Sequence, residues 1–201
     1  KRLHLNSVRR NTSNEEIRRL HRETIQPDRV WIYGHHGVSD IDSIFNRLRY
    51  MIVGCGCRRV VLDHLHMLVL ANKETDERKG IDNIMGRLRA LVEETQAGII
   101  LVSHLKRTNE TVGHENGAAT SLNHLRGSQS IAQLSDTVIG LERNQQSEDK
   151  EVAATTQLRV LKCRETGDAG VADQLLYDKG TGRLDAVVSE FDPDNTVGEI
   201  L

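Results

Sequence analysis

Two apolar stretches decide the fold of this chain: Val60-Val61-Leu62-Asp63 and Ile99-Ile100-Leu101-Val102-Ser103-His104. Both are continuously apolar until they reach a polar side chain, which is typical of parallel strands covered on both faces. Between them, residues 75–95 carry apolar side chains every three or four positions and predict an amphipathic helix. Strand, helix and strand in this order predict an α/β domain. The buried stripe of the helix is expected to be Ile81, Ile84, Met85, Leu88, Leu91 and Val92.

The two polar strand ends predict a ligand site, because open α/β sheets bind ligands at the carboxyl ends of their strands. Asp63 ends its strand in the manner of a Walker B motif, where an acid holds Mg²⁺ beside nucleotide phosphates. His104 is placed to donate a hydrogen bond to a γ-phosphate. Each residue also has an ordinary interpretation, as a capping Asp and as a water-satisfied strand-end His. Their pairing across one complete helix favours the nucleotide site.

The rest of the chain divides into a polar helical lead-in over residues 1–29, a core over residues 30–190 and a polar tail over residues 191–201. A helix is predicted to start near Asn14, and a second to run from a Ser39-Asp40 cap to residue 52. A polar loop is expected at 106–120. Further elements are predicted as a strand at 30–33, a helix at 126–134, a surface turn at 144–151, and antiparallel strands at 137–141, 155–162, 172–177 and 183–187.

The composition limits how the chain can bind nucleic acid. Hydrophobic residues make up 37% and aromatic residues 3%, so the core is expected to be aliphatic. Charged residues reach 28% with a net charge of −2, which argues against a blanket affinity for DNA and requires a local basic cluster instead. The three cysteines are expected to be free thiols, and the adjacent His35-His36 a surface pair rather than a metal site.

A glycine-rich loop that ends in Gly-Lys-Ser/Thr is the usual partner of a Walker B strand. The glycine pairs at 34/37, 54/56 and 180/182 all lack that ending. In RecA-like folds this loop precedes the Walker B strand, so we expect it upstream of Lys1. The chain would then be one portion of a longer protein, and this portion would lack Walker A.

Three later blocks resemble a known family: Leu125 to Asp136, Leu141 to Gln146 and Leu161 to Gly170. With Asp76-Glu77-Arg78-Lys79 and the Asp63-His64 pair, they are similar to the C-terminal half of the ring helicase domain of short-tailed coliphage primase–helicases. The bacterial replicative helicases and the mitochondrial Twinkle helicase are more distant relatives. The resemblance covers about Met51 to Leu184. It implies a RecA-like P-loop NTPase core and a replicative DNA helicase that translocates on single-stranded DNA.

The resemblance also implies roles at the nucleotide. Asp63 would be the Mg²⁺-associated Walker B acid and His104 the γ-phosphate sensor, while Gln133 would link DNA contact to the nucleotide site. Arg143 and Tyr177 would sandwich the base, since a guanidinium plane and a phenol ring both stack on π-faces. The substrate would be ATP or dTTP.

Two further basic residues are expected to act between subunits. Lys162 and Arg164 resemble the pair that reaches into the neighbouring site, with Arg164 as the arginine finger that neutralises charge on the γ-phosphoryl group. A finger supplied in trans requires a homo-oligomeric ring, and the family implies a hexamer. A solvated salt bridge is the ordinary alternative for each of these residues taken alone.

Single-stranded DNA contact is expected in the loop from Lys106 to His124 and the segment after it, because phosphate gripping needs Lys, Arg and backbone N–H groups. Glu110 and Val112 make this loop poorer in lysine than the phage loops, and Ala132 stands where they often have a basic residue. The expected DNA-binding residues are Lys106, Arg107, Asn109, Arg126, Gly127 and Ser128.

We therefore expect a motor ATPase domain that does not turn over nucleotide as residues 1–201 alone. Two alternatives remain open: a recombinase or clock-type RecA relative, and a non-catalytic module that binds single-stranded DNA or a partner subunit. No apolar stretch approaches the ~18 residues of a membrane span. No signal peptide opens the chain, so a cytoplasmic protein is expected, in the host cytoplasm if the protein is phage-encoded.

Overall fold

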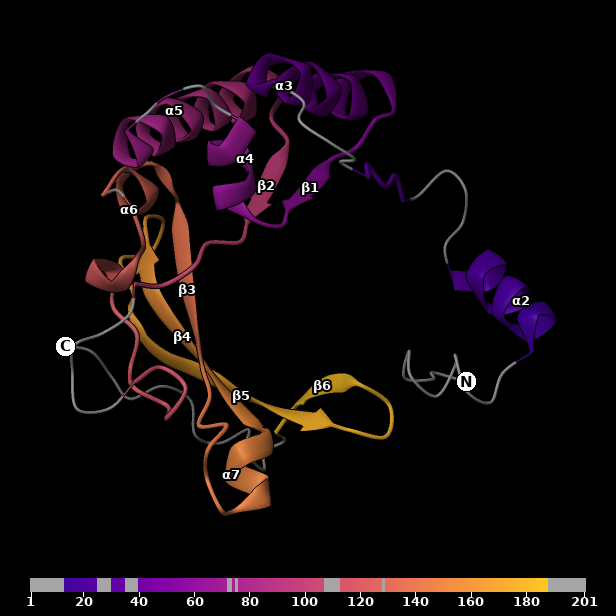
Figure 1. Ribbon diagram of the computed structural model, residues 1–201, viewed down its shortest axis with the longest axis vertical. Helices are drawn as coiled ribbons and strands as arrows, with labels where there is room; N and C mark the ends of the chain where they lie inside the picture. Colours follow the sequence, from indigo (N-terminus) through magenta and orange to yellow (C-terminus); the bar gives the residue numbers. More distant parts are fainter. Residues whose placement is uncertain are drawn as a thin grey trace.

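The computed structural model describes residues 13–24, 30–34, 40–71, 74, 76–106, 113–127 and 129–187. Two sheets form its frame (Figure 1). In the first, β1 (Arg59–Leu62) pairs in parallel with β2 (Gly98–Leu101), and Val61 lies opposite Ile100. The two apolar stretches thus form neighbouring parallel strands, as predicted, and the α/β fold class is confirmed.

Three helices lie next to this parallel pair. The helices α3 (Ile41–Arg49) and α5 (Glu77–Thr95) cover β1 and β2 on one side, and α4 (Leu65–Ala71) follows β1 directly (Figure 1). Asp40 caps α3 by accepting a hydrogen bond from Ser43 N at 3.0 Å, as the sequence predicted. A π-helical turn, Tyr50–Gly54, ends that helix. The helix α4 was not predicted.

The core lies where α3, α4 and α5 meet the sheet. Leu65, Ile81 and Ile84 are fully buried. Asp76 caps α5, and Gln96 ends it in the left-handed conformation with a φ of 56°, so this helix is two residues shorter than predicted. The predicted stripe is buried except Val92, which is half-buried. The core side chains are Ile44, Phe45, Leu48, Ile52, Val60, Leu65, Leu68, Ile81, Ile84, Met85, Leu88, Leu91, Ala97, Leu125, Ile131 and Val138.

The other face of the parallel pair is open in this chain. Val61 is 64% exposed and Ile100 is 58% exposed. The expectation that both faces of these strands are covered is therefore wrong for the described residues. Helices α3 and α5 pack on one side only, and no described element packs on the other.

The second sheet is antiparallel, as predicted, with strand order β3-β4-β5-β6. It extends away from β1 and β2 below α6 (Figure 1). Its strands are β3 (Thr137–Glu142), β4 (Thr155–Cys163), β5 (Gly170–Asp178) and β6 (Arg183–Ala186), and its flanking helices are α6 (Ser130–Leu134) and α7 (Lys150–Ala154). The helix predicted over 126–134 is confined to its second half, because Gly127 has a φ of +107° that a helix cannot include. The expected surface turn at 144–151 includes the start of α7.

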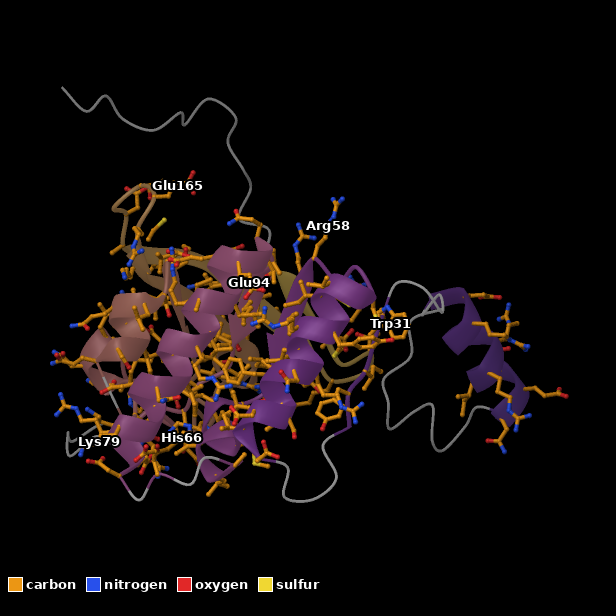
Figure 2. All side chains as sticks on the ribbon, turned by 90° about the horizontal axis from the view of Figure 1, so that it is seen from above. Trp31, Arg58, His66, Lys79, Glu94 and Glu165 are labelled. Carbon is orange, nitrogen blue, oxygen red and sulfur yellow. The ribbon has the colours of Figure 1, made fainter. Side chains whose placement is uncertain are left out.

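One predicted strand is absent. Val30, Trp31, Ile32 and Tyr33 form no strand, since no described strand lies beside them to pair with, and all four are exposed. The predicted N-terminal helix exists as α2 (Asn14–Thr24), which stands apart from the rest in both views (Figures 1 and 2). His35-His36 and residues 188–201 lie outside the described residues. None of the described helices combines the length and the apolar character that a membrane span needs.

Candidate functional site

The two predicted nucleotide residues follow the carboxyl ends of neighbouring strands. Asp63 directly follows β1 and is exposed, and His104 lies three residues past β2. The backbone holds these ends together: Val102 N donates to Leu62 O and Leu65 N donates to Val102 O, both at 2.9 Å. The peptide bond between Asp63 and His64 is cis. Strand register therefore brings the Walker B candidate and the sensor candidate to one edge of the sheet.

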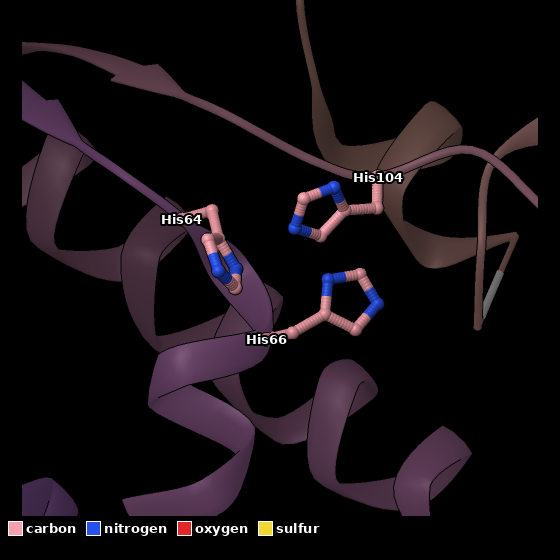
Figure 3. Close-up of side chains that lie close together, drawn as sticks. All are labelled: His64, His66 and His104. Carbon is pink, nitrogen blue, oxygen red and sulfur yellow. The ribbon is translucent and has the colours of Figure 1, made fainter.

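Three imidazole rings meet at this edge (Figure 3). The ring of His104 lies edge-on to that of His64 with 4.3 Å between centroids, and the ring of His66, in the first turn of α4, lies 5.4 Å from that of His104. One ligand atom of each ring lies within 4.8 Å of the others. Asp63 is thus followed by a histidine cluster, which comprises His64, His66 and His104.

The surroundings of His66 favour its neutral form. Burial, followed by the positive charge of Arg126, lowers the pKa of His66 below its usual 6.5, although Glu77 opposes this. Glu77 Oε1 lies 3.7 Å from His66 Nε2 and 3.3 Å from Arg126 Nε. The carboxylate on α5 thus faces both a ring and a guanidinium beside the candidate site.

Leu105 and Leu125 form an antiparallel bridge, and the short stem around it, residues 104–106 and 124–126, holds two of the predicted DNA-binding residues next to His104. Arg126 N donates to His104 O at 3.1 Å, and Lys106 N donates to His124 O at 2.7 Å. An open hollow of about 620 Å³ is lined by His104, Leu105, Lys106 and Arg126. The stem therefore joins the candidate DNA loop directly to the candidate sensor. Arg107, Asn109 and Ser128 lie outside the described residues.

Gly127 is required by packing as well as by its φ. A Cβ at this position would lie 2.0 Å from Ile81 Cδ1, which belongs to the fully buried face of α5. A side chain here would force either the Ile81 side chain or the backbone at Gly127 to shift. The predicted DNA-binding role of Gly127 stays a prediction, and its packing role alone explains the residue type.

Lys162 and Arg164 lie at the end of β4 against the last turn of α6. Lys162 Nζ donates to the carbonyl oxygens of Ala132 and Ser135, both at 2.7 Å. Arg164 donates to Gln133 O at 2.9 Å and lies 3.3 Å from Asp136 Oδ1. Cations suit this position, because the C-terminal carbonyls of a helix are otherwise unpaired. Within the described residues, no hydrogen bond or ion pair joins either cation to Asp63 or His104.

The two predicted base-sandwiching residues come together on the antiparallel sheet. The guanidinium carbon of Arg143 lies 5.6 Å from the ring centroid of Tyr177 on β5, and Arg143 Nε donates to Ala153 O at 2.7 Å. Two groups that contact opposite faces of a flat base must lie about 7 Å apart. The pair must therefore open to admit a base between its members.

A buried carboxylate that the sequence did not single out ties the polar loop to the sheet. Glu142 on β3 has a side chain only 4% exposed, and Arg159 Nε donates to it at 2.6 Å. Thr120 adds hydrogen bonds from its backbone N at 2.6 Å and its hydroxyl at 2.8 Å. Burial would raise the pKa of Glu142, but the hydrogen bonds from Arg159 and Thr120 outweigh it and hold that pKa below its usual value of 4.5.

One protein-family model matches the chain over most of its length. The model described as the DnaB-like helicase C-terminal domain matches residues 1–185. The chain belongs to the DnaB-like helicase C-terminal domain family. As a DnaB-like domain, it has its Asp63 and His104 at the strand ends where RecA-like folds bind ligands.

Individual relatives agree with this assignment. The DnaB-like chain is 39% identical over 163 residues to a DNA helicase/primase of Enterobacteria phage T3, covering 81% of this chain and 28% of that protein. It matches the structure of a DnaB-like replicative helicase, studied with its interactions with primase, at 19% identity with a TM-score of 0.63, covering 90% of this chain and 43% of that one. A KaiC-like protein from Pyrococcus horikoshii OT3 matches at 13% identity with a TM-score of 0.54, covering 92% of this chain and 71% of that one. Both structures show the RecA-like fold, and the chain spans under a third of the phage relative.

His66 and Glu142 are the residues that the sequence reasoning missed. The signal for His66 was available, because His64-x-His66 directly follows a strand whose neighbour ends at His104. Glu142 carried no such signal. Its Arg159 partner lies on the opposite strand, and Thr120 reaches it from the loop, so only the folded chain brings the three together.

Proposed function

We propose that the longer protein to which this DnaB-like chain belongs hydrolyses a nucleoside triphosphate, ATP or dTTP with Mg²⁺, and uses the cycle to translocate on single-stranded DNA during replication. The observation that supports this most is the edge formed by Asp63 and the histidine cluster in a chain that belongs to a helicase family. An acid and a hydrogen-bond donor at neighbouring strand ends are what Mg²⁺-assisted phosphoryl transfer requires.

The proposed roles divide between two subunits. Asp63 would hold the Mg²⁺, which would neutralise charge on the nucleotide phosphates, and His104 would donate to the γ-phosphate. Arg164 would approach the site of the next protomer in a hexameric ring, because its contacts in this chain lie at α6 and Asp136. A cation placed in trans makes hydrolysis depend on assembly, since one protomer supplies only part of the site.

The stem beside His104 would couple DNA contact to the nucleotide site. A phosphate of the DNA strand held by Arg126 would act on a backbone N that donates to His104 O, and one held by Lys106 would act two residues from His104. Gln133 would add a second route, because its carbonyl oxygen accepts from Arg164. Movement of either contact would change the geometry around the γ-phosphate.

The test is nucleotide hydrolysis by the full product of the reading frame, with and without single-stranded DNA. Asp63→Asn is expected to reduce DNA-stimulated turnover by roughly 10²–10³-fold, whereas Asp185→Asn, at an exposed position on β6, is expected to leave it unchanged. Residues 1–201 alone are expected to show no turnover. Turnover by residues 1–201 that survives Asp63→Asn would refute the site, and DNA binding without turnover by the full product would favour a binding module.

A further inference from the structure

We propose that the histidine cluster binds one divalent transition-metal ion of the zinc class. His64, His66 and His104 come from the end of β1, the first turn of α4 and the segment after β2, and their rings face one another (Figure 3). Neutral imidazole is a preferred ligand of Zn²⁺, Co²⁺, Ni²⁺ and Cu²⁺, whereas Mg²⁺ prefers oxygen. This site would therefore be chemically distinct from the Mg²⁺ expected near Asp63.

The ring spacing is close to what a tetrahedral ion needs. Zn–N bonds of about 2.0–2.1 Å place tetrahedral nitrogen ligands about 3.3 Å apart. The cluster already holds one ligand atom of each ring within 4.8 Å of the others. Modest rotation about the side-chain bonds closes the remaining gap, because each ring turns about two single bonds. Three ligands leave the fourth position open to water or an anion, as in catalytic zinc sites.

Unpaired ring nitrogens point to a ligand independently of the spacing. His64 Nδ1, His66 Nδ1 and His66 Nε2 are buried and have no hydrogen-bond partner among the described residues. Buried polar atoms are nearly always paired in native proteins, since leaving one unpaired costs about 1–3 kcal/mol. A shared cation would satisfy one nitrogen of each ring at once.

The second ring nitrogen of His66 already has a suitable neighbour. Nε2 lies 3.7 Å from Glu77 Oε1, so Nδ1 is left to face the other two rings (Figure 3). A carboxylate behind a ligating histidine orients the ring and raises its basicity. Glu77 also faces Arg126, so it offsets the nearest positive charge that would oppose a bound cation.

The experiment is titration of the 201-residue chain with Zn²⁺ by calorimetry and with Co²⁺ by visible absorption, without nucleotide. We expect one ion per chain and Co²⁺ bands typical of tetrahedral coordination. His66→Gln and His104→Gln should each weaken binding by at least about tenfold. The matched control is His114→Gln, which alters a separate histidine pair with 5.1 Å between the ring centroids of His114 and His124, and it should leave binding unchanged.

Several results would overturn the proposal. These are no Zn²⁺ binding by the folded chain, equal binding by His66→Gln, or loss of binding in a Cys55→Ser/Cys57→Ser variant that keeps all three histidines. Circular dichroism of each variant separates ligand loss from unfolding. Because metal binding is measured without nucleotide, its failure leaves the proposed hydrolysis untouched, and failure of hydrolysis leaves the metal site untouched.

Discussion

The guanidinium of Arg164 donates a hydrogen bond to the backbone oxygen of Gln133 at 2.9 Å, so the end of β4 is tied to the last turn of α6. Arg164 also faces Asp136, which accepts from Arg89 on α5. These contacts hold the cation at an exposed edge of the protomer. An exposed edge is where a residue must lie to act on a neighbouring subunit.

Arg164→Ala in the full product is expected to lower nucleotide hydrolysis by about 10³-fold or more, the range measured for arginine fingers. Nucleotide affinity should change little, because the finger acts on charge that develops during the reaction. Stopped-flow binding and steady-state turnover measure the two effects separately. Asp136→Asn removes the ion pair but keeps the guanidinium, and should retain most of the activity. Equal loss of binding and turnover would mean that Arg164 acts in its own subunit.

Glu142→Ala is expected to destabilise the chain by roughly 2–4 kcal/mol, since it leaves Arg159 and the backbone N of Thr120 without their partner. Urea unfolding measures this as a lower midpoint. Glu148→Gln, at an exposed position, is the control and should shift the midpoint by less than about 0.5 kcal/mol. A change of that small size in Glu142→Ala would show that the network is solvated and contributes little.

Glu142 should also make stability depend on acidity. Its pKa in the folded chain lies below the usual 4.5, so the unfolded chain binds a proton more readily. The stabilisation is then fully present above pH 4.5 and is lost as the pH falls through the lower, folded value. Urea midpoints between pH 3 and pH 6 should show this loss in the parent chain and a smaller slope in Glu142→Gln. Parallel slopes in the two proteins would contradict the assignment.

Tyr177→Ala is expected to weaken nucleotide binding by roughly tenfold, because stacking of a base on an aromatic ring contributes about 1–3 kcal/mol. Tyr177→Phe keeps the ring and should bind nearly as well as the parent. Fluorescence titration of the full product with a labelled nucleotide gives both affinities. If Tyr177→Ala binds as tightly as Tyr177→Phe, the ring of Tyr177 does not stack on the base.

Much of the fold was predictable because local signals agreed with one another. The helix α5 has apolar residues at helical spacing and a capping Asp76, and its predicted start lay only two residues before the observed Glu77. The helix α4 lacked such a signal, because Leu65 to Ala71 is apolar almost throughout and shows no polar face. The stretch at Val30 had strand character, but none of the described strands lies beside it, so propensity alone gave the wrong answer there.

The candidate site was predictable only where it follows strand ends. Asp63 and His104 could be placed together because they follow, within three residues, two apolar strands that pair in parallel. His66 enters the same edge through the unpredicted α4. The Lys162 contacts with α6 depend on where a separate sheet meets a helix, which hydrophobic periodicity does not encode.

The central claim is that two neighbouring subunits share one nucleotide site. Its most direct test is to mix two full-length proteins that are each inactive, Asp63→Asn and Arg164→Ala. If Asp63 acts in one subunit and Arg164 in its neighbour, mixed rings contain some interfaces with both native residues. DNA-stimulated hydrolysis should then reappear on mixing, although neither protein is active alone. A mixture that stays as inactive as its components, while gel filtration shows that mixed rings form, would contradict the proposal that the two residues meet across a subunit interface.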